Sequence, residues 1–249
     1  MKTTTQSQMV TIEEKIALYL SRQLKNGELG FVGTGSVLGM AACLLAQDLT
    51  APDLSWIAGE SGFVNPSPPL VRSVSGFQPR TEATKSVNAI TRYLGKGVDF
   101  FIIEVFEIDE KARINRQMAS DYAYAQGSGS TPYLRLAKKA LLFTREHSPS
   151  VLIKRTQFVS TSRIHDKDKT TLLVTPLAVF EWTDKSEKPV LISFFSQGPN
   201  EETIRKKTGF DYLRANEISV VPEPSSEETD SLRTVVDPRG FLRDLYRSV

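Results

Sequence analysis

Glu60 is the side chain whose type and surroundings point most directly to chemistry. It belongs to residues 56–62 (Trp-Ile-Ala-Gly-Glu-Ser-Gly), in which a short apolar run leads into a corner flanked by glycines. A strand ending in this way carries a carboxylate to the C-terminal edge of a sheet, where open α/β sheets bind ligands. Gly59 and Gly62 leave room for a ligand to approach. A solvated surface turn explains the same residues, and spacing alone favours that interpretation.

A second glycine corner lies at residues 33–36 (Gly-Thr-Gly-Ser), between an apolar run at 29–33 and a helical pattern at 37–46. A strand, a glycine turn and a helix N-terminus in this order offer backbone N–H groups and the helix dipole to an anion. Gly33, Gly35 and Gly39 miss the spacing of the dinucleotide-binding fingerprint, and the corner lacks the Lys-Ser/Thr of a P-loop. A ligand cradle and a tight structural corner are both consistent with the pattern.

Four carboxylates follow the most continuous apolar run of the chain, residues 98–103. They are Glu104, Glu107, Asp109 and Glu110. Carboxylates leaving a central strand serve as general acids and bases or as ligands of a hard cation. A structural ion pair is the alternative, and the sequence does not separate that role from a place in the lining of an active site.

The sequence contains few residues that could carry out histidine or cysteine chemistry. The only histidines are His147, beside Glu146, and His165, within the charged residues 164–169, and we predict that both lie on the surface. The single Cys43 falls inside an apolar helical pattern and is expected to be a core residue. We therefore expect no metal centre, no internal disulfide and a reducing compartment.

Composition excludes several other classes. The 249 residues include 31 Lys and Arg against 29 Asp and Glu, so there is no basic field for nucleic acid. No apolar run reaches membrane-spanning length, and residues 1–8 are polar, without the apolar core of a secretory signal. The sequence thus predicts a cytoplasmic protein that binds neither nucleic acid nor membrane.

The order of the remaining patterns predicts the fold class. Thr11 and Glu14 have capping-box spacing at the start of a first helix. Strands at 29–33, 54–58 and 98–103 then alternate with helices at 37–46 and 86–94, which favours a parallel α/β sheet. Further on we predict helical turns at 134–139 and 201–207. Strands are predicted at 140–144, 171–174, 178–182 and 190–195, more antiparallel than the early ones, and an acidic linker at 221–230. Residues 1–10 are expected to be loosely ordered, and residues 11–249 to form one domain.

From residue 13 to 240 the chain resembles the B (β) subunit of family I coenzyme A transferases, closest to the glutaconate and 3-oxoadipate CoA-transferase type. The motifs that carry this resemblance occur in the family's order and at its intervals. They are Leu24-Lys25-Asn26-Gly27, Phe31-Val32-Gly33-Thr34-Gly35-Ser36, Ala51-Pro52-Asp53-Leu54, Glu60-Ser61-Gly62, Arg72-Ser73-Val74, Gly97-Val98-Asp99, Ile108-Asp109, Gly127-Ser128-Gly129, Thr208-Gly209-Phe210-Asp211 and Asp237-Pro238.

The resemblance implies an open three-layer α/β/α fold and an α subunit as partner, in a heterotetramer or larger assembly. It implies that acyl-CoA and a small carboxylic acid are the substrates, with coenzyme A entering as part of the substrate and no cofactor bound permanently. The family's nucleophile maps onto Glu60, which would form an acyl anhydride and then a glutamyl-CoA thioester. The residues implied to contact substrate or stabilise oxyanions are Gly33, Gly35, Ser36, Ser61, Gly62, Glu104, Glu107, Gly127 and Gly129.

One segment departs from the family pattern. Relatives carry a Gly-Gly-Ala-Gln-like segment after the central strand, whereas this chain has Glu104-Val105-Phe106-Glu107. Larger side chains there fill space that an acyl or CoA group would use. The same scaffold hosts CoA-ester hydrolases, C–C lyases and decarboxylases, so these activities, or a non-catalytic β subunit that supports its α partner, are the alternatives to transfer.

Overall fold

The computed structural model describes residues 9–59, 61–71, 80–116, 130–162, 169–184, 186–195 and 201–245. Glu60, Gly127, Gly129 and His165 lie outside these ranges, as do residues 1–8. Within the described ranges, every helix is too short or too polar to cross a lipid bilayer.

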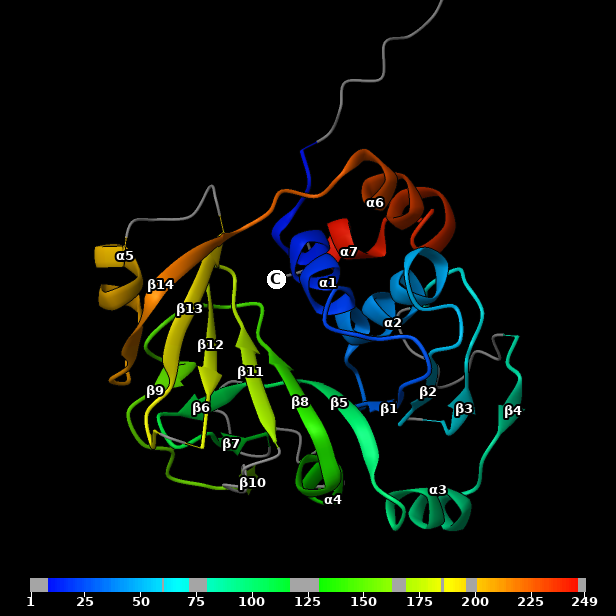
Figure 1. Ribbon diagram of the computed structural model, residues 1–249, viewed down its shortest axis with the longest axis horizontal. Coiled ribbons are helices and arrows are strands. Elements are labelled where there is room, and N and C mark those ends of the chain that lie inside the picture. Colours follow the sequence, from blue (N-terminus) through cyan, green and yellow to red (C-terminus); the bar gives the residue numbers. More distant parts are fainter. Residues whose placement is uncertain are drawn as a thin grey trace, which may run out of the picture.

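A ten-stranded sheet forms the centre of the molecule, in the order β14-β13-β12-β11-β8-β5-β1-β2-β3-β4 (Figure 1). Its five central strands are parallel: β11 (Thr170–Val174), β8 (Ala137–Phe143), β5 (Val98–Glu104), β1 (Leu29–Val32) and β2 (Ser55–Ala58). Antiparallel pairs extend it on one side through β12 (Ala178–Trp182) and β13 (Val190–Phe195), and on the other through β3 (Phe63–Val64) and β4 (Ala83–Thr84). The prediction of a mostly parallel sheet with a more antiparallel C-terminal part is confirmed.

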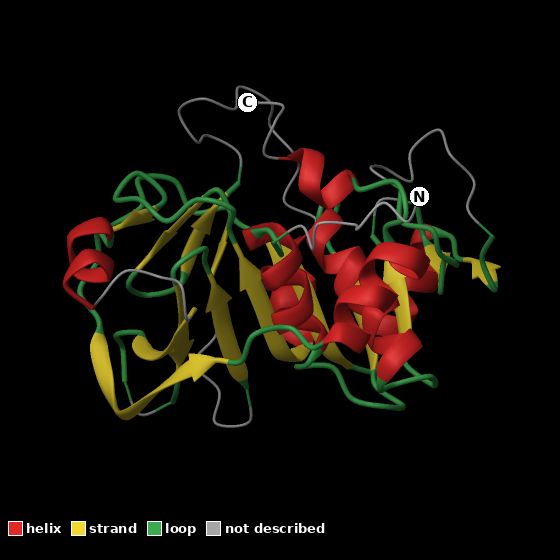
Figure 2. Ribbon diagram, turned by 90° about the horizontal axis from the view of Figure 1, so that it is seen from above, coloured by secondary structure: helices red, strands yellow, loops and turns green. Residues whose placement is uncertain are grey.

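Helices cover one face of this sheet, and they gather there in the view from above (Figure 2). They are α1 (Ile12–Ser21), α2 (Val37–Leu49), α6 (Ser226–Ser231), the π-helical turn η1 (Leu232–Val236) and α7 (Phe241–Asp244). The predicted capping box starts α1: the Thr11 N–H donates to Glu14 Oε2 at 2.8 Å, and the Glu14 N–H donates to Thr11 Oγ1 at 3.3 Å. Ile16, Leu20 and Leu232 pack in the core of this layer.

The opposite face carries a second, four-stranded sheet together with short helices. The small sheet has the order β10 (Thr161–Ser162), β7 (Arg113–Asn115), β6 (Glu107–Asp109) and β9 (Leu152–Ile153). The helices that contribute apolar residues to this side are α3 (Val87–Leu94), α4 (Ser130–Leu136) and α5 (Glu201–Lys207). The sheet thus lies between two layers as expected, but the second layer is partly β-structure, which the sequence patterns did not predict.

Strand β5 shows why both faces of the ten-stranded sheet must be buried. Phe100 and Ile102 pack under the helices, whereas Phe101 and Ile103 pack toward the small sheet, and none of the four is more than 2% exposed. Successive side chains of a strand point to opposite faces, so a continuous apolar run is stable only where both faces are buried. The apolar run at 98–103 is therefore the central parallel strand that the sequence predicts.

The acidic segment at 221–230 is not a linker as predicted. It ends β14 (Leu213–Val221) and then forms α6. A second capping box starts this helix, with the Ser225 N–H 2.8 Å from Glu228 Oε2 and the Glu228 N–H 3.1 Å from Ser225 Oγ. Arg22 also pairs with Glu228 at 2.7 Å. Polar helices have little apolar periodicity, so composition alone suggested a loop here.

The helix predicted at 134–139 is also placed incorrectly. Helix α4 ends at Leu136, and β8 begins at Ala137 without an intervening loop. Lys139 lies in the strand and donates to both carboxylate oxygens of Glu28, at 3.0 and 3.1 Å. Pairing with β5 and β11 on both sides overrides the helical propensity of the Ala-Lys-Lys stretch.

Asp109 holds the small sheet to its neighbouring loops. Its carboxylate is fully buried and accepts hydrogen bonds from the backbone N–H groups of Lys111 (3.0 Å), Arg113 (3.1 Å) and Thr156 (3.1 Å). The Arg113 side chain pairs with it at 2.6 Å. Asp109, one of the four carboxylates at 104–110, therefore forms a structural ion pair with Arg113.

We expect Asp109→Ala to lower the free energy of unfolding by about 3 kcal/mol, because the substitution leaves several buried donors without an acceptor. Urea denaturation measures this difference. Asp211→Ala is the matched control: its carboxylate pairs with Lys154 and Lys188 but is 56% exposed, so its loss should change stability little. Equal effects of the two substitutions would contradict the role given to Asp109.

Candidate active site

The sheet changes its direction of winding between β1 and β5. Strand β1 continues through α2 to β2 on one side, whereas β5, β8 and β11 follow on the other. Open α/β sheets bind ligands at the carboxyl ends of the strands where the order reverses. The residues that follow β1, β2 and β5 therefore define the candidate site, and they include the predicted Gly33, Gly35, Ser36, Ser61, Gly62 and Glu104.

In the glycine turn after β1, some residues contact β5 and others are exposed to solvent. The Gly33 N–H donates to the Ile102 carbonyl at 2.7 Å, and a Cβ at Gly33 would meet Ile103 Cγ1 at 2.7 Å. The Ser36 hydroxyl is fully buried and accepts a hydrogen bond from the Glu104 N–H at 3.0 Å. Gly35 is exposed with φ +72°, and a Cβ there would have nothing within 4 Å. Gly33 and Ser36 thus lock β1 to β5, while Gly35 faces open space.

The corner that bears Glu60 lies next to this turn. The Gly59 N–H donates to the Val32 carbonyl at 2.8 Å, and a Cβ at Gly59 would lie 3.9 Å from the Gly33 Cα. Ser61 and Gly62 both donate their N–H groups to the Ala58 carbonyl, at 3.2 and 2.8 Å. The two glycine corners are therefore neighbours, one after β1 and one after β2. Glu60 itself lies outside the described residues, so its role stays a prediction.

Glu104 ends β5 with its carboxylate paired to arginine. The Oε1 atom lies 2.6 Å from Arg145 Nε, and the residue is only 8% exposed. Glu107 belongs to the small sheet, where it accepts from Asn115 Nδ2 at 2.7 Å and from Thr156 Oγ1 at 3.4 Å. The two predicted carboxylates therefore have separate protein partners. The described residues contain no group of three His, Cys, Asp or Glu side chains suited to a metal ion.

Arg116, which sequence reasoning did not single out, reaches the glycine turn from the small sheet. Its Nη2 donates to the Thr34 carbonyl at 3.3 Å, and its guanidinium lies 5.4 Å from the centre of the Phe106 ring. The residue is 9% exposed, and Nε has no hydrogen-bond partner among the described residues. Burial lowers the pKa of Arg116, and the Glu104 carboxylate opposes that shift. No spacing in the sequence marks this arginine among the 31 basic residues.

The prediction that both histidines lie on the surface is wrong for His147. It is 6% exposed, and its ring nitrogens lie 2.8 Å from Thr175 Oγ1 and 2.9 Å from Thr208 Oγ1. Burial and then the charge of Lys207 lower the pKa of His147 to about 4. The side chain thus joins the segments after β8, β11 and α5 as a neutral ring.

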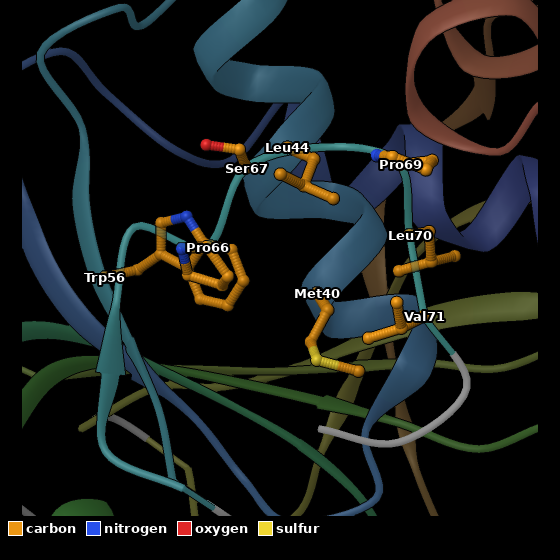
Figure 3. Close-up of a pocket in the computed structure, with 8 residues that line it drawn as sticks. All are labelled: Met40, Leu44, Trp56, Pro66, Ser67, Pro69, Leu70 and Val71. Carbon is orange, nitrogen blue, oxygen red and sulfur yellow. The ribbon is translucent and has the colours of Figure 1, made fainter. Parts of the chain in front are cut away.

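A small apolar cavity, partly open to solvent, lies between α2 and residues 66–71 (Figure 3). Apart from Ser67, its lining is apolar, with Trp56 and Pro66 on one side and Met40, Leu44, Leu70 and Val71 on the other. Such a lining supplies no acid, base or nucleophile, so the cavity contains none of the predicted chemistry.

Comparison with known proteins supports the fold. No protein-family model matches the sequence, and no curated protein sequence does either. Among solved structures, the decarboxylase AibA/AibB matches with a TM-score of 0.83 and 22% identity, over 95% of this chain and 99% of that one. Glutaconate coenzyme A-transferase from Acidaminococcus fermentans gives 0.77 and 20%, over 93% and 96%. IpdAB from Rhodococcus jostii RHA1 gives 0.75 and 16%, over 94% and 97%.

The chain has the fold of family I coenzyme A transferases. The resemblance inferred from its motifs is thus confirmed for the architecture. In this CoA-transferase fold the two glycine corners meet at the carboxyl edge of β1 and β2. The contacts of Glu104 and Glu107 with substrate stay predictions, as do those of Ser61 and of the glycines at 127 and 129.

Gly62→Ala should cost far more stability than Gly27→Ala. Both glycines have positive φ, +72° and +76°, so both substitutions carry the same backbone penalty of about 1 kcal/mol. A Cβ at Gly62 would also overlap the Lys85 carbonyl, whereas one at Gly27 would have nothing within 4 Å. We therefore expect Gly62→Ala to lose about 3 kcal/mol or more in urea denaturation. Similar losses at the two positions would show that the corner after β2 is not closely packed.

His147 should make stability depend on pH. Because its pKa falls from 6.5 to about 4 on folding, the unfolded chain binds the extra proton between these values. The neutral His147 ring contributes about 3 kcal/mol to the free energy of unfolding. This contribution is fully present above pH 6.5 and is lost as the pH falls to about 4. Urea denaturation at pH 7 and pH 4.5 should show a smaller drop for His147→Gln than for the wild type. Identical drops would mean that the histidine is protonated in the folded state.

Proposed function

We propose that the chain is the β subunit of a coenzyme A transferase in which Glu60 is the nucleophile. The observation that carries this proposal is the position of the 59–62 corner, which is hydrogen-bonded to the end of β1 beside the glycine turn at 33–36. The match to glutaconate coenzyme A-transferase supports it. Glycines on both sides of Glu60 suit a carboxylate that must come close to a bulky thioester.

In the proposed reaction, a Glu60 carboxylate oxygen attacks the acyl-CoA carbonyl and expels CoA thiolate, which gives an acyl-glutamyl anhydride. The thiolate then attacks the glutamyl carbonyl and releases the first carboxylic acid, leaving a glutamyl-CoA thioester. A second carboxylate attacks this thioester and expels CoA thiolate, which gives a second acyl-glutamyl anhydride. The thiolate then attacks the acyl carbonyl of this anhydride, which forms the new acyl-CoA and releases the Glu60 carboxylate. Backbone N–H groups of the glycine turns, with Gly35 on the open side, would stabilise the oxyanions.

The proposal includes an α-subunit partner. Two of the matched structures, AibA/AibB and IpdAB, carry names that denote paired components. The site described here is open at Thr34 and Gly35, which suits a site completed by another chain. We propose a heterotetramer or larger assembly with acyl-CoA and a small carboxylic acid as its substrates.

A second candidate function is decarboxylation, hydrolysis or C–C cleavage of an acyl-CoA. Glu104 at the end of β5 favours it, because this side chain stands where the family pattern has a glycine and is paired with Arg145. The decarboxylase AibA/AibB matches with the higher TM-score, 0.83 against 0.77. In this case Glu60 would not form a covalent intermediate.

Covalent labelling of Glu60 separates the candidates. The chain is co-expressed with its α partner, incubated with an acyl-CoA and treated with hydroxylamine or borohydride, and the modified peptide is mapped by mass spectrometry. Transfer predicts modification at Glu60. It also predicts a loss of turnover on the order of 10⁴-fold or more in Glu60→Gln.

The matched control is Glu202→Gln on α5, whose carboxylate is 68% exposed and pairs only with Lys206 among the described residues. It should keep full activity and labelling. Turnover that survives Glu60→Gln without any label would replace transfer by hydrolysis, cleavage or decarboxylation. A stable complex with no turnover of any acyl-CoA would instead indicate a β subunit that supports its partner.

A further inference from the structure

The glycine turn at residues 33–36 is a type II β-turn. The Ser36 N–H donates to the Gly33 carbonyl at 3.1 Å, and Gly35, the third residue of the turn, has φ +72°. Thr34 has a negative φ, as type II requires and type I′ does not. Type II differs from type I mainly by a rotation of the central peptide, here the one between Thr34 and Gly35, through about 180°.

Arg116 holds this peptide in the type II orientation. Its Nη2 donates to the Thr34 carbonyl at 3.3 Å. A guanidinium has donors only and stays protonated, so it attracts a carbonyl and disfavours an N–H group in the same place. A change to type I would turn the Gly35 N–H toward Arg116 and break the hydrogen bond. The side chain therefore stabilises one turn type and destabilises the other.

The position of Arg116 is itself fixed by other contacts. Its backbone N–H donates to Ser160 Oγ at 2.9 Å, next to β10. The guanidinium packs over the Phe106 ring, 5.4 Å from its centre, and the residue is only 9% exposed. A packed arginine in a buried setting loses little freedom when it makes a hydrogen bond, so its hold on the turn is strong.

The orientation of the central peptide determines where the Gly35 N–H points. The C=O and N–H groups of a trans peptide point in opposite directions. Because the Thr34 carbonyl faces Arg116, the Gly35 N–H points away from that side chain. Thr34 and Gly35 are exposed, and no described residue accepts a hydrogen bond from the Gly35 N–H. This donor is therefore fixed in direction and accessible at the carboxyl edge of the sheet.

We propose that Arg116 is a positioning residue that holds the Gly35 N–H as a hydrogen-bond donor for the thioester oxygen of a bound acyl-CoA. The inference rests on the proposed function and deepens it, since Glu60 belongs to the neighbouring corner. When a nucleophile attacks the thioester carbonyl, its oxygen gains negative charge, which returns to the carbonyl as the thiolate leaves. A donor that is already oriented stabilises this charge without having to reorganise.

The test combines kinetics and crystal structures of the complex with the α partner. Loss of acetyl-CoA, butyryl-CoA or glutaryl-CoA, whichever the unchanged complex consumes fastest, is followed in the presence of propionate. We expect Arg116→Met to lower kcat on the order of 10- to 100-fold and to change KM by less than about 3-fold, because the donor acts in the transition state. In the crystal structure of this variant, φ of Gly35 should become negative as the turn changes to type I.

Thr34→Pro provides a rescue that separates positioning from folding. Proline followed by glycine at the two central positions favours a type II turn by itself. No described residue accepts a hydrogen bond from the Thr34 N–H, which proline removes. In the Thr34→Pro background, Arg116→Met should lower kcat by less than about 3-fold. An equal loss with and without the proline would overturn the proposal, because it would indicate a general effect on the fold.

Gly35→Ala and Gly97→Ala form a matched pair. Both glycines have positive φ, +72° and +80°, and a Cβ at either would have nothing within 4 Å. Alanine disfavours positive φ, so Gly35→Ala should shift the turn toward type I and reproduce the loss in kcat. Gly97 precedes β5, at the amino end of that strand, so Gly97→Ala should leave kcat unchanged. Equal effects at the two glycines, or a type II turn retained in Arg116→Met, would overturn the proposal.

The outcomes for Arg116 and for Glu60 are distinguishable. Hydrolysis, decarboxylation and transfer all place negative charge on the thioester oxygen, so Arg116→Met should lower kcat even if Glu60 is never labelled. Missing label would then count against the transferase mechanism alone. Labelling of Glu60 at an unchanged rate in Arg116→Met would overturn the positioning role alone. If Arg116→Met failed to assemble, an unchanged kcat in Gly35→Ala would still overturn it.

Discussion

The junction between β1 and β5 is the contact on which the rest of the molecule depends. Two hydrogen bonds close it, from Gly33 N–H to Ile102 O at 2.7 Å and from Glu104 N–H to the buried Ser36 hydroxyl at 3.0 Å. A side chain at position 33 would collide with Ile103, so the close approach requires glycine there. Because winding reverses at this junction, its geometry sets where the ends of β1, β2 and β5 meet.

Charged side chains at the carboxyl ends of β1 and β5 contact the residues of this junction. Glu104 is held by its backbone N–H through Ser36 and by its carboxylate through Arg145. Arg116 is held from the other side by Thr34 and Phe106. Glu104, the first residue of the segment that departs from the family pattern, therefore lies near two arginines at the end of β5.

Local patterns predicted the elements that have a clear signature in the sequence. The capping box at Thr11 and the continuous apolar run at 98–103 are such signatures, and both agree with the fold. Features set by tertiary contacts were not predictable. His147 is buried because Thr175 and Thr208, 28 and 61 residues away, lie within hydrogen-bond distance of its two ring nitrogens. Arg116 reaches Thr34 across 82 residues, a pairing that no local spacing encodes.

The helical layer joins segments from distant parts of the sequence. Leu232, Val236 and Leu242 share one apolar cluster with Ile16 and Leu20, and Arg233 pairs with the buried Glu14 at 2.9 Å. During translation, α1 and α2 therefore emerge long before the residues that seal them against water. Until those residues leave the ribosome, the apolar surface of the first two helices stays open to solvent or to a chaperone. The order of synthesis thus delays closure of this core, although most of the sheet strands precede the sealing helices in the sequence.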